Sequence, residues 1–245
     1  MNEQWKTVVI GGVIGAAFSL AIVFAFGWFG ILPGASDARI HQYLVAHPEV
    51  LVDMSDQLQK QQADKEQQEH RAVIAKLGLK RFFNPSVAYV TGPANAKNTF
   101  VEFFDYNCIH CRNSVATVKK FYNAHKNDTR FAFIEFPIFG HDSTAAARVA
   151  LAARGQDNLY LTLHFLLMGE ANTIDTNLLF ADAKKAGLDM AKLDAALSSP
   201  GLDQIIATGH KLAEEARIDG TPTFIINGKM HPGEISDADL KTLLK

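Results

Sequence analysis

The chain has 245 residues, enough for one sizeable domain with additional segments, and its formal net charge is −2. A near-neutral chain without a basic stripe gives no electrostatic basis for binding nucleic acid, so we expect no nucleic-acid partner. Its two cysteines are too few for a framework of several structural disulfides.

Residues 8–32 are uncharged and mostly apolar, which is long enough for a membrane-spanning helix and longer than most signal-peptide cores. Small residues at positions 34–36 leave a cleaved signal as the alternative. We favour a retained N-terminal anchor within residues 1–35. Lys6 and the amino terminus most simply stay in the cytoplasm, which leaves the large domain on the other side of the membrane.

Residues 36–81 are predicted to form a helical stalk that is interrupted once, at His47-Pro48, because proline suits the first turn of a second helix. Apolar residues at coiled-coil spacing are Leu51, Met54 and Leu58. Residues 57–71 are almost entirely polar, so the apolar stripe through which two or more helices could pair as a coiled coil is short. The segment is either a solvated spacer or the contact of a homo-oligomer, a dimer or trimer formed through residues 36–81.

From residue 82 to residue 245 the pattern alternates between strands and helices. Strands are predicted at residues 87–90, 99–104 and 130–136, with a helix to about residue 126 before the last of them. The second and third strands should be parallel, because a helix connects them. A helical insertion is expected at about residues 141–217. The chain then ends in a strand at 223–226, a type I′ turn at Asn227-Gly228, a strand at 229–231 and a helix at 237–244. This order predicts an α/β fold with an inserted helical block.

The strongest chemical signal is the pair Cys108 and Cys111, directly after the apolar strand at 99–104. Apolar residues that continue from Cys111 at helical spacing are Val115, Val118 and Tyr122. Cys108 therefore lies where a helix begins, and free backbone N–H groups and the helix dipole stabilise a thiolate there. Because the thiolate is the reactive form of cysteine, the pattern predicts a redox site.

Other interpretations of the pair fit less well. A structural zinc site needs four ligands, but the chain has two cysteines, and its nine histidines show no His-x₃-His pair. Attached haem needs histidine directly after the second cysteine, where Arg112 stands. We expect no metal and no cofactor beyond a redox-active Cys108–Cys111 disulfide. A copper- or zinc-binding module that uses the two cysteines remains the alternative of a different class.

Three motifs together resemble the DsbA family of thioredoxin-fold disulfide oxidoreductases. They are the cysteine-bearing segment 101–111, the run Glu135-Phe136-Pro137-Ile138-Phe139-Gly140, and the segment Gly220–Gly228. The resemblance covers roughly residues 82–245 and implies a thioredoxin fold with an inserted helical subdomain. Residues 40–51 are similar to the extension of ScsC-like and Com1-like relatives, in which this extension mediates oligomerisation and some members are credited with isomerase activity.

The resemblance implies a role for each matching residue. Cys108 would be the attacking thiolate and Cys111 the resolving thiol, and His110 corresponds to the histidine that stabilises the thiolate. Glu102 resembles the buried acid that shuttles protons for the resolving cysteine. A buried carboxyl has a raised pKa, which suits that task.

Thr221-Pro222 resembles the cis-proline loop that faces the cysteines, where a substrate segment pairs with the backbone as an extra strand. Ile109 replaces the proline common at its position, and threonine rather than valine precedes Pro222. Ile109 is compatible with a more reducing or a more isomerase-like poise, and threonine before the proline is the residue found in isomerase-like members, which favours a dual role. The family implies a periplasmic catalyst that oxidises or isomerises disulfides in cysteine-containing exported proteins, and this location agrees with the inner-membrane anchor predicted from residues 8–32. It also implies a membrane redox-recycling partner. A dedicated thiol reductase is the second alternative.

Overall fold

A computed structural model describes residue 24 and residues 35–156 and 159–244. The anchor predicted at residues 8–32 lies outside the described residues apart from Phe24. Within the described ranges, no helix combines the length and apolar character needed to cross a membrane. By its internal contacts the chain divides into two units, Met1–Asp64 and Lys65–Lys245.

The first unit contains α2 (Ala35–Ala46) and the first part of α3 (Glu49–Leu77). The helix break predicted at His47-Pro48 is confirmed. In the described part of this unit, several large apolar side chains are more than half exposed: Ile40, Tyr43, Val45, Leu51, Val52, Met54 and Leu58. An α-helical segment with this much exposed apolar surface has no core of its own to bury it.

The second unit begins within α3, earlier than the start at residue 82 expected from the pattern. The end of α3 and the short 3₁₀ helix η1 (Leu79–Phe83) carry Ile74 and Phe82, which are fully buried in one of the domain's two apolar clusters. Phe82 packs edge-on against Phe103 of the central sheet. These residues therefore belong to the core of the domain.

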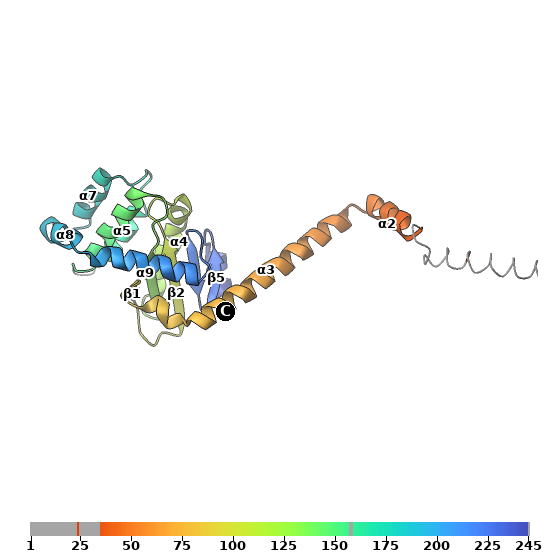
Figure 1. The fold of residues 1–245 in the computed structure, drawn as a ribbon, viewed down its shortest axis with the longest axis horizontal. Coiled ribbons are helices and arrows are strands. Elements are labelled where there is room, and N and C mark those ends of the chain that lie inside the picture. The colour runs from red at the N-terminus through yellow and green to blue at the C-terminus, as the bar shows by residue number, and fades with distance from the viewer. Residues whose placement is uncertain (1–23, 25–34, 157–158, 245) are drawn as a thin grey trace, which may run out of the picture. The chain divides into compact units, whose positions relative to one another are not determined.

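A five-stranded sheet forms the centre of this unit, in the order β1-β3-β2-β4-β5 (Figure 1). The strands are β1 (Tyr89–Thr91), β2 (Asn98–Phe104), β3 (Thr129–Glu135), β4 (Thr223–Ile226) and β5 (Lys229–Pro232). The predicted parallel pairing of β2 with β3 is confirmed, and the other pairs are antiparallel. Asn227 and Gly228 both have positive φ, as the predicted type I′ turn between β4 and β5 requires.

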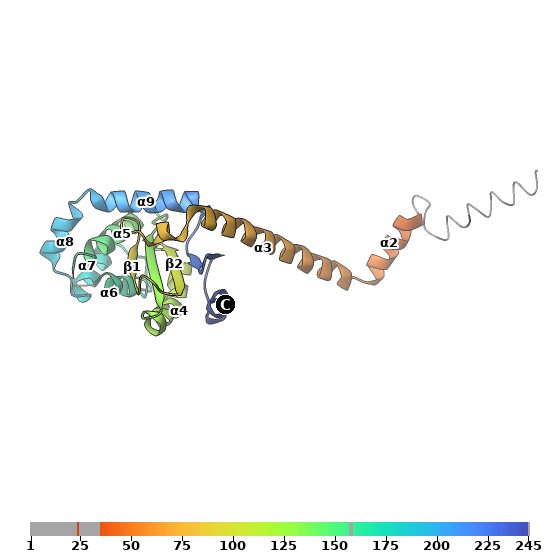
Figure 2. The same ribbon diagram turned by 90° about the horizontal axis from the view of Figure 1, so that it is seen from below.

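Both faces of the sheet are apolar and covered by helices. On one face Phe100 and Phe104 pack toward α4 (Ile109–His125), and α10 (Asp237–Leu243) joins the same cluster. On the other face Val101 and Phe103 belong to the cluster that includes α9 (Gly201–Glu215). Figure 2 shows α9 and α4 on opposite sides of the strands. This layering explains why β2 is apolar at nearly every position rather than at alternate ones.

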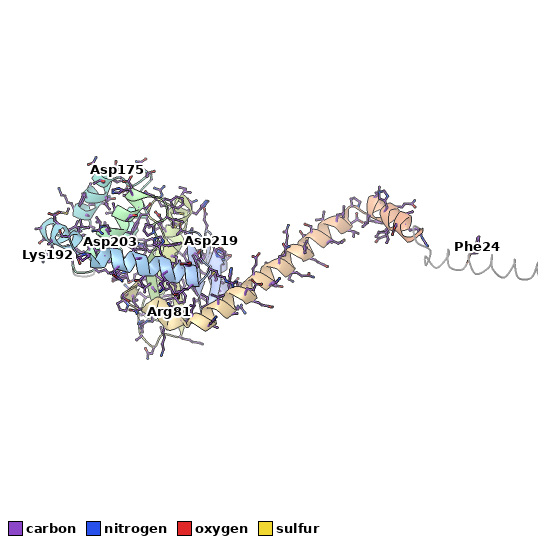
Figure 3. The ribbon with its side chains drawn as sticks, viewed as in Figure 1. Phe24, Arg81, Asp175, Lys192, Asp203 and Asp219 are labelled. Carbon is purple, nitrogen blue, oxygen red and sulfur yellow. The ribbon has the colours of Figure 1, made fainter. Side chains whose placement is uncertain are left out.

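The range predicted for the helical insertion, about residues 141–217, contains α5 (His141–Ala153), α6 (Leu159–Leu167), α7 (Thr176–Lys185), α8 (Met190–Leu197) and also α9, which covers one face of the sheet. Alanine-rich α5 contacts α6, α7, α8 and α9, because its small side chains allow close approach. Asp175 caps α7 by accepting a 2.8 Å hydrogen bond from the Leu178 amide, and Arg148 of α5 pairs with Asp203 of α9. Figure 3 labels Asp175 and Asp203. The insertion is thus a packed subdomain beside the sheet.

Candidate active site

The turn between β2 and α4 is organised by the buried carboxylate of Asp105. Its Oδ1 accepts a 2.7 Å hydrogen bond from the Asn107 amide, and its Oδ2 accepts bonds from the amides of Ile138 (2.7 Å) and Phe139 (3.0 Å). The Cys108 amide donates to the Asp105 carbonyl. These bonds fix the backbone that leads into α4, at which Cys108 is the N-cap residue, as predicted.

The two thiols are unbonded and equally covered, each about 1% exposed. Accessibility therefore does not distinguish them, but their acidity does. Hydrogen bonding with the Cys111 thiol and from backbone N–H groups at the start of α4 lowers the pKa of Cys108 to about 5. Burial raises the pKa of Cys111 far above its usual range. At neutral pH, Cys108 is the thiolate and Cys111 keeps its proton.

The loop before β4 lies against the reactive sulfur. The Cys108 Sγ lies 3.2 Å from the carbonyl oxygen of Thr221, to which it donates a hydrogen bond when it is protonated. The Thr221–Pro222 peptide bond is cis, as the family resemblance implies. Since β4 pairs with β2, the sheet brings these two segments, more than a hundred residues apart in the chain, to the same end of the domain.

Glu102 lies on β2, on the same sheet face as Phe100 and Phe104, and is 3% exposed. Burial raises the pKa of its carboxyl to about 8, and its Oε2 atom is buried without a hydrogen-bond partner. The charge of Glu102 also contributes to the raised pKa of Cys111, which places the carboxyl within electrostatic reach of that thiol. A carboxyl that changes protonation near neutral pH beside a protonated thiol is suited to proton transfer.

His110 is exposed on the first turn of α4. Its Nδ1 lies 2.7 Å from Oε1 of Glu234, in the loop between β5 and α10. The hydrogen bond to this carboxylate raises the pKa of His110, and the charge of Cys108 raises it further. Sequence reasoning found His110 but not Glu234, because the two lie 124 positions apart and no local pattern connects them.

Two comparisons bear on this geometry. The family model described as thioredoxin matches residues 86–245. The chain belongs to the thioredoxin family. The three site motifs and the structural neighbours place it there as a DsbA-like thiol–disulfide oxidoreductase. A second family model, the N-terminal domain of the copper resistance protein ScsC, matches residues 37–65 of this oxidoreductase.

The individual proteins similar to this chain include one that is described as a thioredoxin-like oxidoreductase. A thioredoxin-like oxidoreductase from Silicibacter pomeroyi DSS-3 is 33% identical, with a TM-score of 0.63 over 68% of this chain and 95% of that one. BcfH from Salmonella enterica Typhimurium is 27% identical, with a TM-score of 0.70 over 90% and 98%. The Na(+)/H(+) antiporter NhaA of Herminiimonas arsenicoxydans is 24% identical over 162 residues, which are 66% of this chain and 26% of that protein. The oxidoreductase thus spans about a quarter of the length of such antiporters.

The helical insertion of this oxidoreductase holds the cysteine turn from the side. Asn107 accepts a 2.7 Å bond from the Ile174 amide and donates one of 3.3 Å to the Ile174 carbonyl. Arg112, one residue after Cys111, donates to the Asn172 carbonyl at 2.6 Å. These hydrogen bonds were not predictable from the pattern of residues, because their partners are backbone groups of a distant loop.

A second buried carboxyl, Glu135, belongs to one of the three motifs but lies outside the group of residues that act on the cysteines. It accepts hydrogen bonds from the hydroxyls of Tyr160 (2.8 Å) and Tyr106 (3.3 Å), and the Tyr106 hydroxyl also lies 3.3 Å from His164 Nδ1. Burial raises the pKa of Glu135 to about 8. Like Glu102, Glu135 is an isolated acid in an apolar strand.

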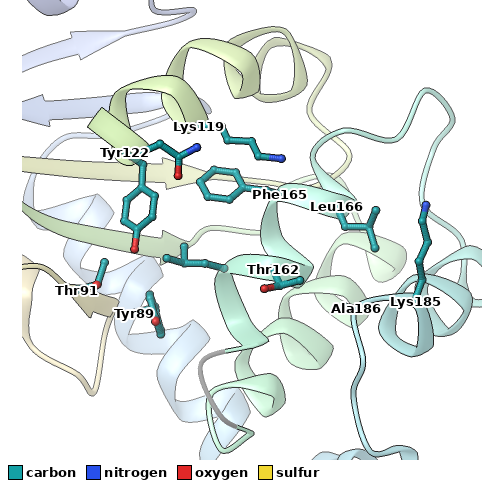
Figure 4. Close-up of a pocket in the computed structure, with 11 residues that line it drawn as sticks. Tyr89, Thr91, Lys119, Tyr122, Thr162, Phe165, Leu166, Lys185 and Ala186 are labelled. Atoms are coloured by element: carbon teal, nitrogen blue, oxygen red, sulfur yellow. The ribbon is translucent and has the colours of Figure 1, made fainter. Parts of the chain in front are cut away.

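A pocket of about 720 Å³ opens between α4, α6 and β1 (Figure 4). Its lining residues include Tyr89, Lys119, Tyr122, Thr162, Phe165 and Lys185. Neither cysteine nor Thr221 is among the described residues that line this pocket. We therefore assign thiol chemistry to the surface around Cys108 and not to this pocket. Among the described residues there is also no cluster of three or more His, Cys, Asp or Glu side chains that could hold a metal ion.

Proposed function

We propose that this protein is a periplasmic thiol–disulfide exchange catalyst that oxidises and isomerises disulfides in exported proteins. The observation that carries the proposal is the opposite acidity of two adjacent thiols, with the pKa of Cys108 lowered to about 5 and that of Cys111 raised. A thiol of low pKa is both an available nucleophile and a good leaving group. The Cys111 thiol stays protonated until the resolving step.

In the oxidising direction, a substrate thiolate attacks the Cys108 sulfur of the Cys108–Cys111 disulfide. The S–S bond breaks, a mixed disulfide forms at Cys108, and Cys111 leaves with the electron pair. Glu102, whose pKa is raised to about 8 by burial, is the nearby acid that supplies the proton to Cys111. A second substrate thiolate then attacks the substrate sulfur and releases Cys108 as a thiolate. Two substrate thiols are oxidised and one enzyme disulfide is reduced.

In the isomerising direction, the reduced enzyme begins the reaction. The Cys108 thiolate attacks an incorrect substrate disulfide, and another substrate thiolate later displaces it. Where no such thiolate arrives, Cys111 passes its proton to Glu102 and attacks Cys108, which releases the reduced substrate. The balance between these outcomes depends on the reduction potential of the pair and on the compartment.

The surroundings of the cysteines support a polypeptide substrate. The carbonyl of Thr221 lies at the reactive sulfur, where an extended substrate segment would pair with the loop backbone. Three large apolar side chains on the cysteine turn and the adjoining loop are exposed: Ile109 (54%), Ile138 (40%) and Phe139 (55%). Such a surface suits cysteine-containing segments that have not yet been buried by folding.

The experiment that tests the function is the redox equilibrium of the full-length protein with glutathione, combined with refolding of two forms of ribonuclease. We expect a measurable Cys108–Cys111 disulfide and faster recovery of activity from both reduced and scrambled ribonuclease. A strongly reducing equilibrium, with insulin reduction as the only activity, would contradict the proposal and point to a dedicated thiol reductase. A protein that exchanges with neither would not be an oxidoreductase of this kind.

We also propose that residues 36–81 join copies of the chain into a dimer or trimer, and that an N-terminal anchor keeps them at the inner membrane beside a redox-recycling partner. Support for the oligomer comes from the exposed apolar residues of α2 and α3 and from the match to the ScsC N-terminal domain. Joined copies would place several cysteine pairs around one substrate, which favours isomerisation.

Changing two apolar stalk residues to charged ones should dissociate this oligomer. We expect Leu51→Asp with Leu58→Asp to lower the mass in solution to that of one chain, because buried charges without partners are unfavourable. The matched control is Gln59→Asp with Ala63→Asp, which adds the same charge at exposed positions of α3 away from the stripe of Leu51, Met54 and Leu58, and should keep the wild-type mass. Light scattering coupled to size exclusion measures both. A wild-type mass of one chain would mean that the stalk is a spacer.

A further inference from the structure

The loop between β5 and α10 presents one carboxylate to the start of the cysteine-bearing helix. Oε1 of Glu234 lies 2.7 Å from Nδ1 of His110 and accepts a 2.8 Å hydrogen bond from the side-chain amide of Asn113. His110 and Asn113 belong to the first turns of α4, directly after Cys108. One oxygen of Glu234 is therefore shared by two groups of the helix that begins at the reactive thiol.

Glu234 is held in place by its neighbours rather than by this contact alone. Its carbonyl lies 2.9 Å from Nε2 of His231. The next residue, Ile235, is buried and donates its amide to Oγ of Ser114, which itself donates to the carbonyl of His110. An exposed ion pair between two mobile side chains has little effect, but here the loop and the helix are docked on each other.

We propose that Glu234 is a positioning residue of the redox site: it orients the His110 ring on α4 and keeps it charged, so that His110 stabilises the Cys108 thiolate. This inference rests on the proposed exchange chemistry at Cys108. It adds a residue of the β5–α10 loop to a site otherwise formed by β2, α4 and the Thr221 loop.

Two opposite electrostatic effects have to be weighed. The carboxylate by itself disfavours a second negative charge at Cys108 and would raise the pKa of that thiol. Acting through His110, it raises the pKa of the imidazole, and a charged imidazole lowers the pKa of Cys108. The second effect should dominate, because Glu234 touches His110 directly, whereas in an exposed setting its influence on the more distant sulfur is screened by water and salt.

Other titratable or charged side chains lie on the elements packed around this pair. His231 faces Glu234 from β5, and Asp237 at the start of α10 pairs with Lys120 of α4 at 2.5 Å. Arg112 of α4 is engaged with the helical insertion. Asp237 offers a matched control, since it is a carboxylate on a neighbouring segment that binds the same helix without touching His110.

The test compares Glu234→Gln with Asp237→Asn in the full-length protein. Glutamine keeps the shape and an acceptor oxygen but removes the charge. We expect Glu234→Gln to lower the pKa of His110, which NMR titration measures. The same variant should raise the pKa of Cys108, which is measured from the pH dependence of its alkylation rate. The equilibrium constant for oxidation of glutathione should fall about threefold, or about 15 mV. Asp237→Asn should leave both pKa values at their wild-type positions.

A double-mutant cycle separates positioning from a direct charge effect. In a His110→Ala background, Glu234→Gln should no longer raise the pKa of Cys108. The inference is overturned if, in the wild-type background, Glu234→Gln lowers the pKa of Cys108 or leaves it unchanged. It is also overturned if Glu234→Gln raises the pKa of Cys108 by the same amount in the His110→Ala background. These outcomes differ from failure of the proposed function, in which the wild-type protein itself would not exchange with glutathione. Glu234→Asp, which keeps the charge, should restore part of the wild-type behaviour.

Discussion

Cys108→Ala is expected to reduce thiol–disulfide exchange to the uncatalysed rate, because it removes the one thiol that is ionised at neutral pH. Cys111→Ala should have a different effect: Cys108 still attacks, but the mixed disulfide with the substrate is no longer resolved within the enzyme. The low pKa of Cys108, about 5, further predicts that its alkylation rate is flat above about pH 6 and falls as pH drops through 5.

Insulin reduction and mass spectrometry of the trapped species measure these outcomes. Substantial turnover in Cys108→Ala, or accumulation of a mixed disulfide at Cys111 rather than at Cys108, would contradict the assigned roles. Each single variant retains one cysteine, so each serves as the control for the other. The reduced and oxidised wild-type protein should show the same far-UV circular dichroism as both variants if the fold is unaffected.

The parts of the site that could be predicted are those encoded by neighbouring residues. The apolar run of β2, the helical spacing after Cys111 and the position of Cys108 between them are local, and the structure confirms all three. The strand boundaries of β4 and the turn at Asn227-Gly228 were also predictable, because turns of this type need residues that accept positive φ.

The parts that could not be predicted depend on contacts between distant segments. Glu234 meets His110 only because the β5–α10 loop folds back onto α4, and Asn107 meets Ile174 only because the insertion lies beside the turn. Neither residue stands in a pattern that differs from an ordinary polar loop. The Thr221 loop was found through family resemblance rather than from its own residues, since periodicity gives no reason for it to lie at a cysteine.

Two buried carboxyls lower the free energy of unfolding of this domain when the pH rises above mildly acidic values. The pKa values of Glu102 and Glu135 are both raised to about 8, from an ordinary value of 4.5. Glu135 has two tyrosine hydroxyls as partners, whereas Oε2 of Glu102 is buried without one. A carboxyl with a strongly shifted pKa beside a reactive thiol is a candidate for a functional role, and for Glu102 that role is proton transfer to and from Cys111.

Glu102→Gln should therefore raise the free energy of unfolding at high pH and slow the proton transfer at Cys111. Below pH 4.5 the carboxyl is protonated in both folded and unfolded states, so the substitution changes the free energy of unfolding little there. As pH rises from 4.5 to 8, the unfolded state ionises while the folded state holds its proton, and the wild-type protein loses stability. Because glutamine cannot ionise, the variant should be about 1–3 kcal/mol more stable at pH 8, measured by urea unfolding at pH 5 and pH 8.

The same substitution should slow the step in which Cys111 gains or loses a proton by about tenfold to a hundredfold, a typical range for loss of a general acid–base group. Stopped-flow measurement of mixed-disulfide resolution isolates that step. Glu135→Gln is the matched control, since it removes an equally shifted carboxyl whose hydrogen bonds go to Tyr106 and Tyr160. It should give the same sign of stability change and leave resolution near the wild-type rate. Equal slowing by both variants would show that loss of buried charge, rather than proton transfer by Glu102, controls the step.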